Sequence, residues 1–158
     1  KAVGMMESLE SLASQLEEGK EALLDALAGC GLEEFSWEGK GSSLRHLLEG
    51  AVDALNLRFG RLVAMALGLP PTPCIVPAQL SSPREAAMVL QVAHRRLLNL
   101  LHLVGPQDLE RTVVTSAGER LTLAQVLAQV VQAYRGWAEE VRALRKAYAS
   151  PKGEGHGH

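Results

Sequence analysis

The sequence predicts an all-α protein, a four-helix bundle that forms one domain. Hydrophobic residues make up 47% of the 158 residues and are mostly Leu and Ala, whereas aromatic residues make up only 4%. That mixture favours helices over sheets. Four segments also repeat apolar side chains at the three- and four-residue spacing of an amphipathic helix. No internal repeat and no strand–helix–strand alternation is evident in the sequence.

The first two helices follow from apolar periodicity and from the residues that bound it. Over residues 6–30, leucines recur at helical spacing and glutamates occupy the opposite face. The second helix is expected over residues 43–67. Ser42 and Ser43 are candidate N-caps for it, and Gly68 with the two prolines that follow ends it.

The third and fourth helices begin with sharper signals. Residues 82–85 read Ser-Pro-Arg-Glu, which supplies an N-cap serine, a proline at the first helical position and a capping-box glutamate for a helix over 83–104. The fourth helix is expected over 122–149 and opens with a Thr-x-x-Gln capping box. Residues 112–115, Thr-Val-Val-Thr, lie between these helices and suggest either extended chain or a brief hairpin.

A long proline-rich connection joins the second and third helices. It contains Pro70, Pro71, Pro73 and Pro77, which make it stiff and unsuited to a helix or a strand. At roughly 3.3 Å per extended residue it could cover about 45 Å, whereas a helix of 25 residues is about 37 Å long. The second and third helices could therefore lie parallel, in an up-down-down-up order. The alternative is a disordered loop between antiparallel helices.

Charge and cysteine content exclude some classes of protein. The net charge of −2 gives no case for nucleic-acid binding. Nine of the 18 acidic residues lie in the first 40 positions, which indicates an acidic helix beside more basic ones or, as the alternative, an acidic docking face. Cys30 and Cys74 have no metal-binding spacing and are expected to be unpaired in a reducing cytoplasm. We expect one domain over residues 1–150, a flexible tail over 151–158 and no membrane span.

The order of these motifs resembles the DinB-like superfamily over about residues 8–148. Helix 2 of that family is entered through a motif close to W-S-x-x-E-x-L-x-H. Here Trp37 lies slightly upstream and residues 43–50 read SLRHLLEG. Helix 4 of the family reads close to L-x-H-x-x-x-H-x-x-x-H-x-x-Q-I, and residues 127–141 read LAQVVQAYRGWAEEV. The family includes metal-dependent hydrolases and thiol S-transferases, and it commonly forms homodimers.

The resemblance places the three metal-binding histidines of the family at positions that hold other residues here, namely Gly50, Ala133 and Trp137. Glycine and alanine offer no donor atom, and the indole nitrogen carries a proton. His46 and Glu140 are the weak alternative ligands, and they would need further partners. We therefore expect a degenerate metal site and no cofactor. We also expect the indole of Trp137 to fill the old pocket by reaching over Gly50 and Ala133. The alternative is that Trp137 is a core or dimer-interface aromatic residue unrelated to that site.

Other candidate chemistry is sparse. There is no nucleophile elbow, phosphate-binding loop or dinucleotide fingerprint. His94 flanks the apolar stripe of the third helix and is expected to be half-buried and hydrogen-bonded, with a ligand role as the alternative. His102 is expected to be solvated. The pair Arg95 and Arg96 could grip an anion, but a solvated pair is the more usual outcome, and Cys74 lacks a nearby cation that would make its thiol reactive.

The sequence therefore supports two alternative hypotheses for the function. The first is a metal-free DinB-like protein that acts as a non-catalytic binding or structural module in the cytoplasm. The resemblance implies a homodimer, and the sequence names no small-molecule ligand. The alternative is a thiol S-transferase or hydrolase of the DinB-like type that holds a divalent metal with non-standard ligands.

Overall fold

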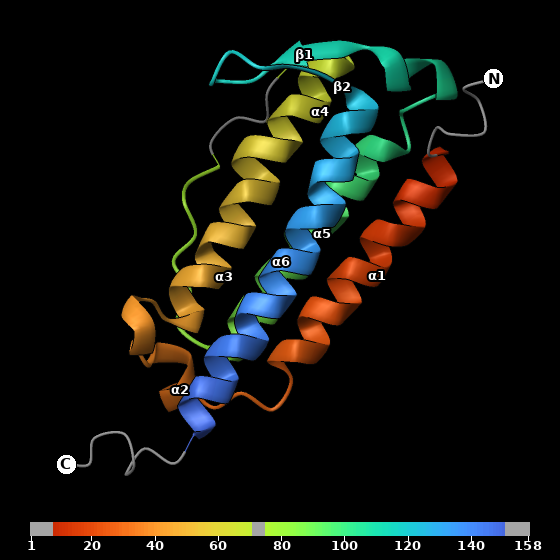
Figure 1. The fold of residues 1–158 in the computed structure, drawn as a ribbon. Coiled ribbons are helices and arrows are strands. Elements are labelled where there is room, and N and C mark those ends of the chain that lie inside the picture. The colour runs from red at the N-terminus through yellow and green to blue at the C-terminus, as the bar shows by residue number, and fades with distance from the viewer. Residues whose placement is uncertain (1–7, 71–74, 151–158) are drawn as a thin grey trace.

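A computed structural model describes residues 8–70 and 75–150 of the chain. This part of the chain is mostly helical, as predicted, with one small two-stranded sheet. Figure 1 shows the longest helices lying lengthwise beside one another, with the hairpin across one end and α2 at the other. The predictions for the tail over 151–158, for Cys74, and for Pro71 and Pro73 lie outside the described residues.

The longer helical elements lie close to the predicted ranges. They are α1 (Leu9–Leu27), α3 (Leu44–Asp53), the π-helical η3 (Ala54–Phe59), α4 (Gly60–Ala66), α5 (Pro83–Leu101) and α6 (Leu123–Ala149). The shorter elements are α2 (Leu32–Ser36), η2 (Gly39–Gly41), η4 (Pro106–Glu110), β1 (Thr112–Val114) and β2 (Arg120–Thr122). Helix α2 and the π-helical segment were not predicted.

Hydrogen-bonding side chains fix the helix starts. The hydroxyl of Ser43 accepts from the backbone N–H of His46 at 3.0 Å, so Ser43 is the cap of α3. The predicted capping box at the start of α6 is closed in both directions. At the start of α5, Ser82 caps the helix, but the carboxylate of Glu85 accepts from the backbone and hydroxyl of Ser81 at 2.7 Å. The predicted box there is thus displaced by one residue.

The second long helical stretch widens by one residue at η3. The backbone N–H of Gly60 donates to the carbonyl of Leu55, five residues earlier. A Cβ atom on residue 60 would lie 2.8 Å from that carbonyl oxygen, so glycine permits the close approach. Leu55 and Phe59, both within η3, point into the core, where each is 1% exposed.

The segment between η4 and α6 forms an antiparallel hairpin, so the hairpin alternative for this segment is confirmed. Val113 faces Leu121 in the pairing register, and both side chains are buried against the end of the helices. The turn is closed by backbone hydrogen bonds of 2.8 Å from Thr115 to Glu119 and from Gly118 to Thr115. Gly118 has φ +87°, a conformation that side chains other than glycine rarely adopt.

Residues 75–82 run beside α3. The backbone N–H of Ala78 donates to the carboxylate of Asp53, and that of Leu80 donates to the carboxylate of Glu49, both at 2.8 Å. The side chain of Leu80 is 4% exposed and joins the core. Two acidic residues of α3 therefore hold this part of the connection in place.

The core is continuous from one end of the helices to the other. Its largest fully buried side chains are Tyr134, Phe35 and Phe59, surrounded by leucines. Helix α6 packs most extensively along α1. None of the helices in the described ranges is both long and apolar enough to cross a membrane.

Candidate functional site

The three positions expected for metal ligands lie at the edge of the helical core. Ala133 and Trp137 are partly buried and pack against the core from one side of α6. Gly50 is exposed, because the buried face of α3 is formed by Leu44, Leu48, Ala51 and Val52. None of the three residues offers a donor for a metal ion.

The predicted plug of the old pocket is wrong with respect to Gly50. No atom outside the local helix lies within 4 Å of the point that a Cβ atom of residue 50 would occupy, so the indole of Trp137 does not cover it. The indole instead meets the ring of Tyr134 edge to face, with 5.4 Å between ring centroids and 80° between planes. Trp137 is thus an aromatic side chain at the rim of the core.

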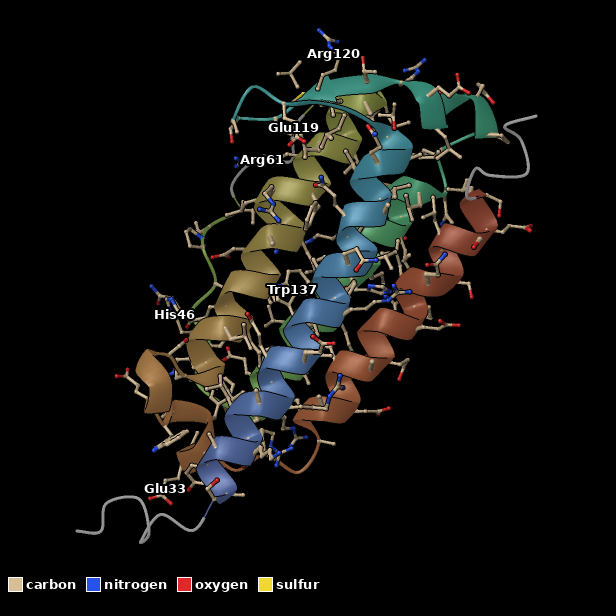
Figure 2. All side chains as sticks on the ribbon, viewed as in Figure 1. Glu33, His46, Arg61, Glu119, Arg120 and Trp137 are labelled. Atoms are coloured by element: carbon tan, nitrogen blue, oxygen red, sulfur yellow. The ribbon has the colours of Figure 1, made fainter. Side chains whose placement is uncertain are left out.

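The weak alternative ligands are not brought together with these positions into a metal centre. His46 and Glu140 are both exposed. Figure 2 places Trp137 between α6 and α3, whereas His46 lies on the outer side of α3. Among residues 8–70 and 75–150, no three His, Cys, Asp or Glu side chains form a group that could hold a metal ion.

A polar chain crosses the core where α1, α5 and α6 meet. Nδ1 of His94 lies 2.7 Å from the hydroxyl of Tyr134, and Nε2 lies 3.0 Å from the carboxylate of Glu17. Because the ionised carboxylate can only accept, Nε2 carries the proton, and Nδ1 accepts the hydroxyl proton of Tyr134. The prediction of a hydrogen-bonded His94 is confirmed, although the ring is more buried than expected, at 3% exposed.

Burial and hydrogen bonding shift the pKa values of these three side chains. Burial lowers the pKa of His94, and the hydrogen bond to Glu17 opposes that effect. Burial also raises the pKa of Tyr134. Hydrogen bonds from Lys20 and then from His94 lower the pKa of Glu17. An acid, an imidazole and a hydroxyl in series resemble a proton relay, but the side chain of Tyr134 is 0% exposed. No substrate can reach its hydroxyl in this conformation. The hydrogen bonds between Tyr134, His94 and Glu17 therefore serve to join the three helices.

The one cysteine among the residues that the structure describes has a thiol of low reactivity. Cys30 carries a free thiol, as predicted. Burial, followed by the nearby carboxylate of Glu34, raises the pKa of this thiol to about 11, while the guanidinium of Arg145 opposes the rise. The reactive thiolate is therefore scarce at neutral pH.

A cleft with a different chemistry lies between the hairpin and the second long helical stretch. We name it the arginine cleft. It has a volume of about 620 Å³ and is lined by Leu57, Arg58, Phe59, Arg61, Leu62, Met65, Val114, Thr115, Ser116, Ala117, Glu119 and Gln129. Figure 2 shows Arg61 and Glu119 at the end of the molecule that carries the hairpin.

The arginine cleft lies beside the two positions of the expected metal site that belong to α6. Gln129, Ala133 and Trp137 succeed one another at four-residue intervals, so they form one strip along α6. Gln129 lies in the cleft wall, and the other two residues continue the strip away from the hairpin.

Sequence reasoning missed this cleft. Arg58 and Arg61 stand three residues apart and share a helix face with Met65, a pattern that also suits an ordinary solvated face. Only the hairpin, more than 50 residues later in the chain, turns that face into a cleft. By contrast, Arg96 of the predicted arginine pair hydrogen-bonds the side chain of Asn56 at 3.2 Å.

Comparison of the chain with protein-family models, with curated proteins and with solved structures finds no match. The resemblance to the DinB-like superfamily therefore stays a prediction that rests on the motifs of residues 43–50 and 127–141.

Proposed function

We propose that this chain is a metal-free protein of the DinB-like type that acts as a non-catalytic binding module, in a four-helix bundle of up-down-down-up order that pairs as a homodimer. The course of residues 75–82 supports the order of helices. These residues run beside α3 and are held by Asp53 and Glu49, which suits a connection that travels along the bundle. A short turn between antiparallel helices would not need that course.

One observation carries the functional part of the proposal. The three positions where the family would hold its metal lie at an accessible edge of the core, yet Gly50, Ala133 and Trp137 provide no donor atom. Because the helices are held by a continuous apolar core, the fold does not depend on a metal. A protein that has lost the reactive group and kept an adjoining cleft is suited to binding.

Metal analysis of the purified protein tests the proposal. After dialysis, the protein should contain far less than one equivalent of nickel, zinc or iron per chain. A stoichiometric metal that resists dialysis would instead support the alternative, a metal-dependent transferase or hydrolase with non-standard ligands. Light scattering during size-exclusion chromatography tests the homodimer, and a monomer mass at micromolar concentration would contradict it.

A reciprocal experiment tests whether the positions were assigned correctly. The triple variant Gly50→His, Ala133→His and Trp137→His should gain affinity for zinc, because three imidazoles would then project from the positions expected for ligands. The double variant Ala133→His and Trp137→His, which lacks the imidazole on α3, is the matched control and should bind zinc more weakly than the triple variant. Equal zinc affinity of the triple variant and this control would contradict the assignment.

A further inference from the structure

We propose that the arginine cleft binds a small organic carboxylate that has an apolar body. This inference rests on the proposed function, because it names the class of ligand that the binding module takes. It does not involve the three expected ligand positions, since none of them lines the cleft.

Charge is the first argument. Arg58 and Arg61 are both exposed and both line the cleft. Among the residues that the structure describes, neither guanidinium forms an ion pair, although the carboxylate of Glu119 lines the same cleft. Arginine stays charged at any physiological pH, so the lining carries two positive charges and one negative charge. An anionic ligand would balance this excess.

The position of Arg58 is the second argument. Its guanidinium carbon lies 4.4 Å from the centroid of the Phe59 ring. Contact with an aromatic face orients a guanidinium and leaves its N–H groups available for a carboxylate. A planar guanidinium can donate two parallel hydrogen bonds to one carboxylate, which a surface lysine cannot do.

The apolar lining is the third argument. Met65 on α4 is 54% exposed and Val114 on β1 is 46% exposed, and both line the cleft. Phe59 and Leu62 are buried residues that also contribute to the lining. Because exposed apolar surface is unfavourable in water, a ligand with an apolar body would gain free energy by covering Met65 and Val114. A bare inorganic anion would not use this surface.

The walls of the cleft are formed before any ligand arrives. The hairpin turn is held by its backbone hydrogen bonds and by a bond of 3.1 Å from the N–H of Glu119 to the hydroxyl of Thr115. The volume of about 620 Å³ falls within the range of roughly 300–1,000 Å³ that is common for small-molecule sites. Because the hairpin backbone is already ordered, binding does not have to order this wall of the cleft.

Titration calorimetry of the full chain with sodium octanoate tests the inference. Saturable binding of one octanoate per chain is expected, whereas 1-octanol and inorganic phosphate should each bind at least about tenfold more weakly. Octanol lacks the charge and phosphate lacks the apolar body. Octanol or phosphate that binds as tightly as octanoate would overturn the proposed ligand class, as would the absence of saturable octanoate binding at millimolar concentration.

Matched variants locate the site. The double variant Arg58→Gln and Arg61→Gln should weaken octanoate binding by about tenfold or more, because two charged donors are lost. Arg142→Gln, at an exposed position of α6 outside the cleft, should change the affinity by less than about twofold. Equal affinities of these two variants would show that octanoate binds elsewhere.

A second pair of variants tests the apolar wall. Met65→Ser should weaken octanoate binding, because the apolar body of the ligand loses a contact, whereas Met88→Ser should not, although Met88 is likewise exposed, at 61%, on α5. Circular dichroism must show that each variant is folded. Metal content is measured on the same samples. A metal-loaded chain that binds octanoate contradicts the proposed function alone, and a metal-free chain that does not bind it contradicts this inference alone.

Discussion

The hydroxyl of Tyr134 donates a hydrogen bond to Nδ1 of His94, with 2.7 Å between the two atoms, inside the core of the protein. The two residues stand 40 positions apart in the sequence and lie on α6 and α5. Glu17 on α1 accepts from the other ring nitrogen, so one imidazole joins three helices. Buried polar groups that are fully paired in this way specify how helices pack against one another.

The variant Tyr134→Phe tests the value of this bond. The ring would keep its packing, but Nδ1 of His94 would lose its donor in a place that water cannot reach. An unpaired buried acceptor costs about 1–3 kcal/mol. The free energy of unfolding, measured with urea, should fall by about that amount while the helical circular dichroism is unchanged. A variant as stable as the parent would show that the bond contributes nothing.

From the burial of His94 between Tyr134 and Glu17 we predict that the protein loses stability in mild acid. In the folded chain the pKa of His94 lies below its ordinary value of 6.5, so the folded protein resists a proton that the unfolded chain accepts. Stability should therefore be complete above pH 6.5 and fall as the pH drops below it, by at most about 1.4 kcal/mol per pH unit for one proton. The lowered pKa of Glu17 adds a loss in the same direction below its ordinary value of 4.5.

Urea unfolding between pH 5 and pH 8 measures this dependence. The variant His94→Gln should be less stable at pH 8 and should lack the loss between pH 6.5 and pH 5. His46 and His102 stay in place as exposed internal controls. Parallel pH curves for parent and variant would assign the acid sensitivity to groups other than His94.

The sequence was sufficient for those features of the fold that depend on neighbouring residues. Caps at Ser43, Ser82 and Thr122 lie where local side-chain chemistry predicts them, because each bond spans only three residues. The π-helical turn could not be predicted in the same way. Its one local signal is Gly60, and a lone glycine within a helix fits a regular α-helical turn equally well.

Contacts between segments that are distant in the sequence could not be predicted from the sequence alone. That His94 would be hydrogen-bonded followed from its place on the apolar stripe, but its partners Tyr134 and Glu17 depend on how three helices pack. The error at Gly50 was avoidable. Leu48 and Ala51 mark the buried face of α3, and position 50 lies away from it, so the space over Gly50 had no need of an indole.

Close packing of α1 on α6 predicts opposite effects for two glycine variants. A Cβ atom on residue 19 would lie 2.7 Å from Cβ of Tyr134, so Gly19→Ala should cost about 1–3 kcal/mol. A Cβ atom on residue 136 of α6 would meet nothing within 4 Å. Gly136→Ala should therefore raise stability by about 0.5–1 kcal/mol, since alanine favours a helix interior. Thermal unfolding measures both, and equal shifts would contradict this account.

Arg145 links the end of α6 to α2 and to the end of α1. Its guanidinium forms two bonds with the carboxylate of Glu34, at 2.8 and 3.2 Å, and donates to the backbone carbonyls of Ala26 and Ala28. Since Glu34 is 12% exposed, removing the arginine would leave a carboxylate and two carbonyls with fewer donors.

The variant Arg145→Gln should thus lower the free energy of unfolding by about 2–3 kcal/mol. Arg145→Lys should recover only part of the loss, because an ammonium cannot reproduce the planar fork that reaches both Glu34 and the end of α1. Arg142→Gln, one turn earlier and exposed, should stay within about 0.5 kcal/mol of the parent. If charge alone mattered, lysine at position 145 would restore full stability, and urea unfolding of the three variants distinguishes these outcomes.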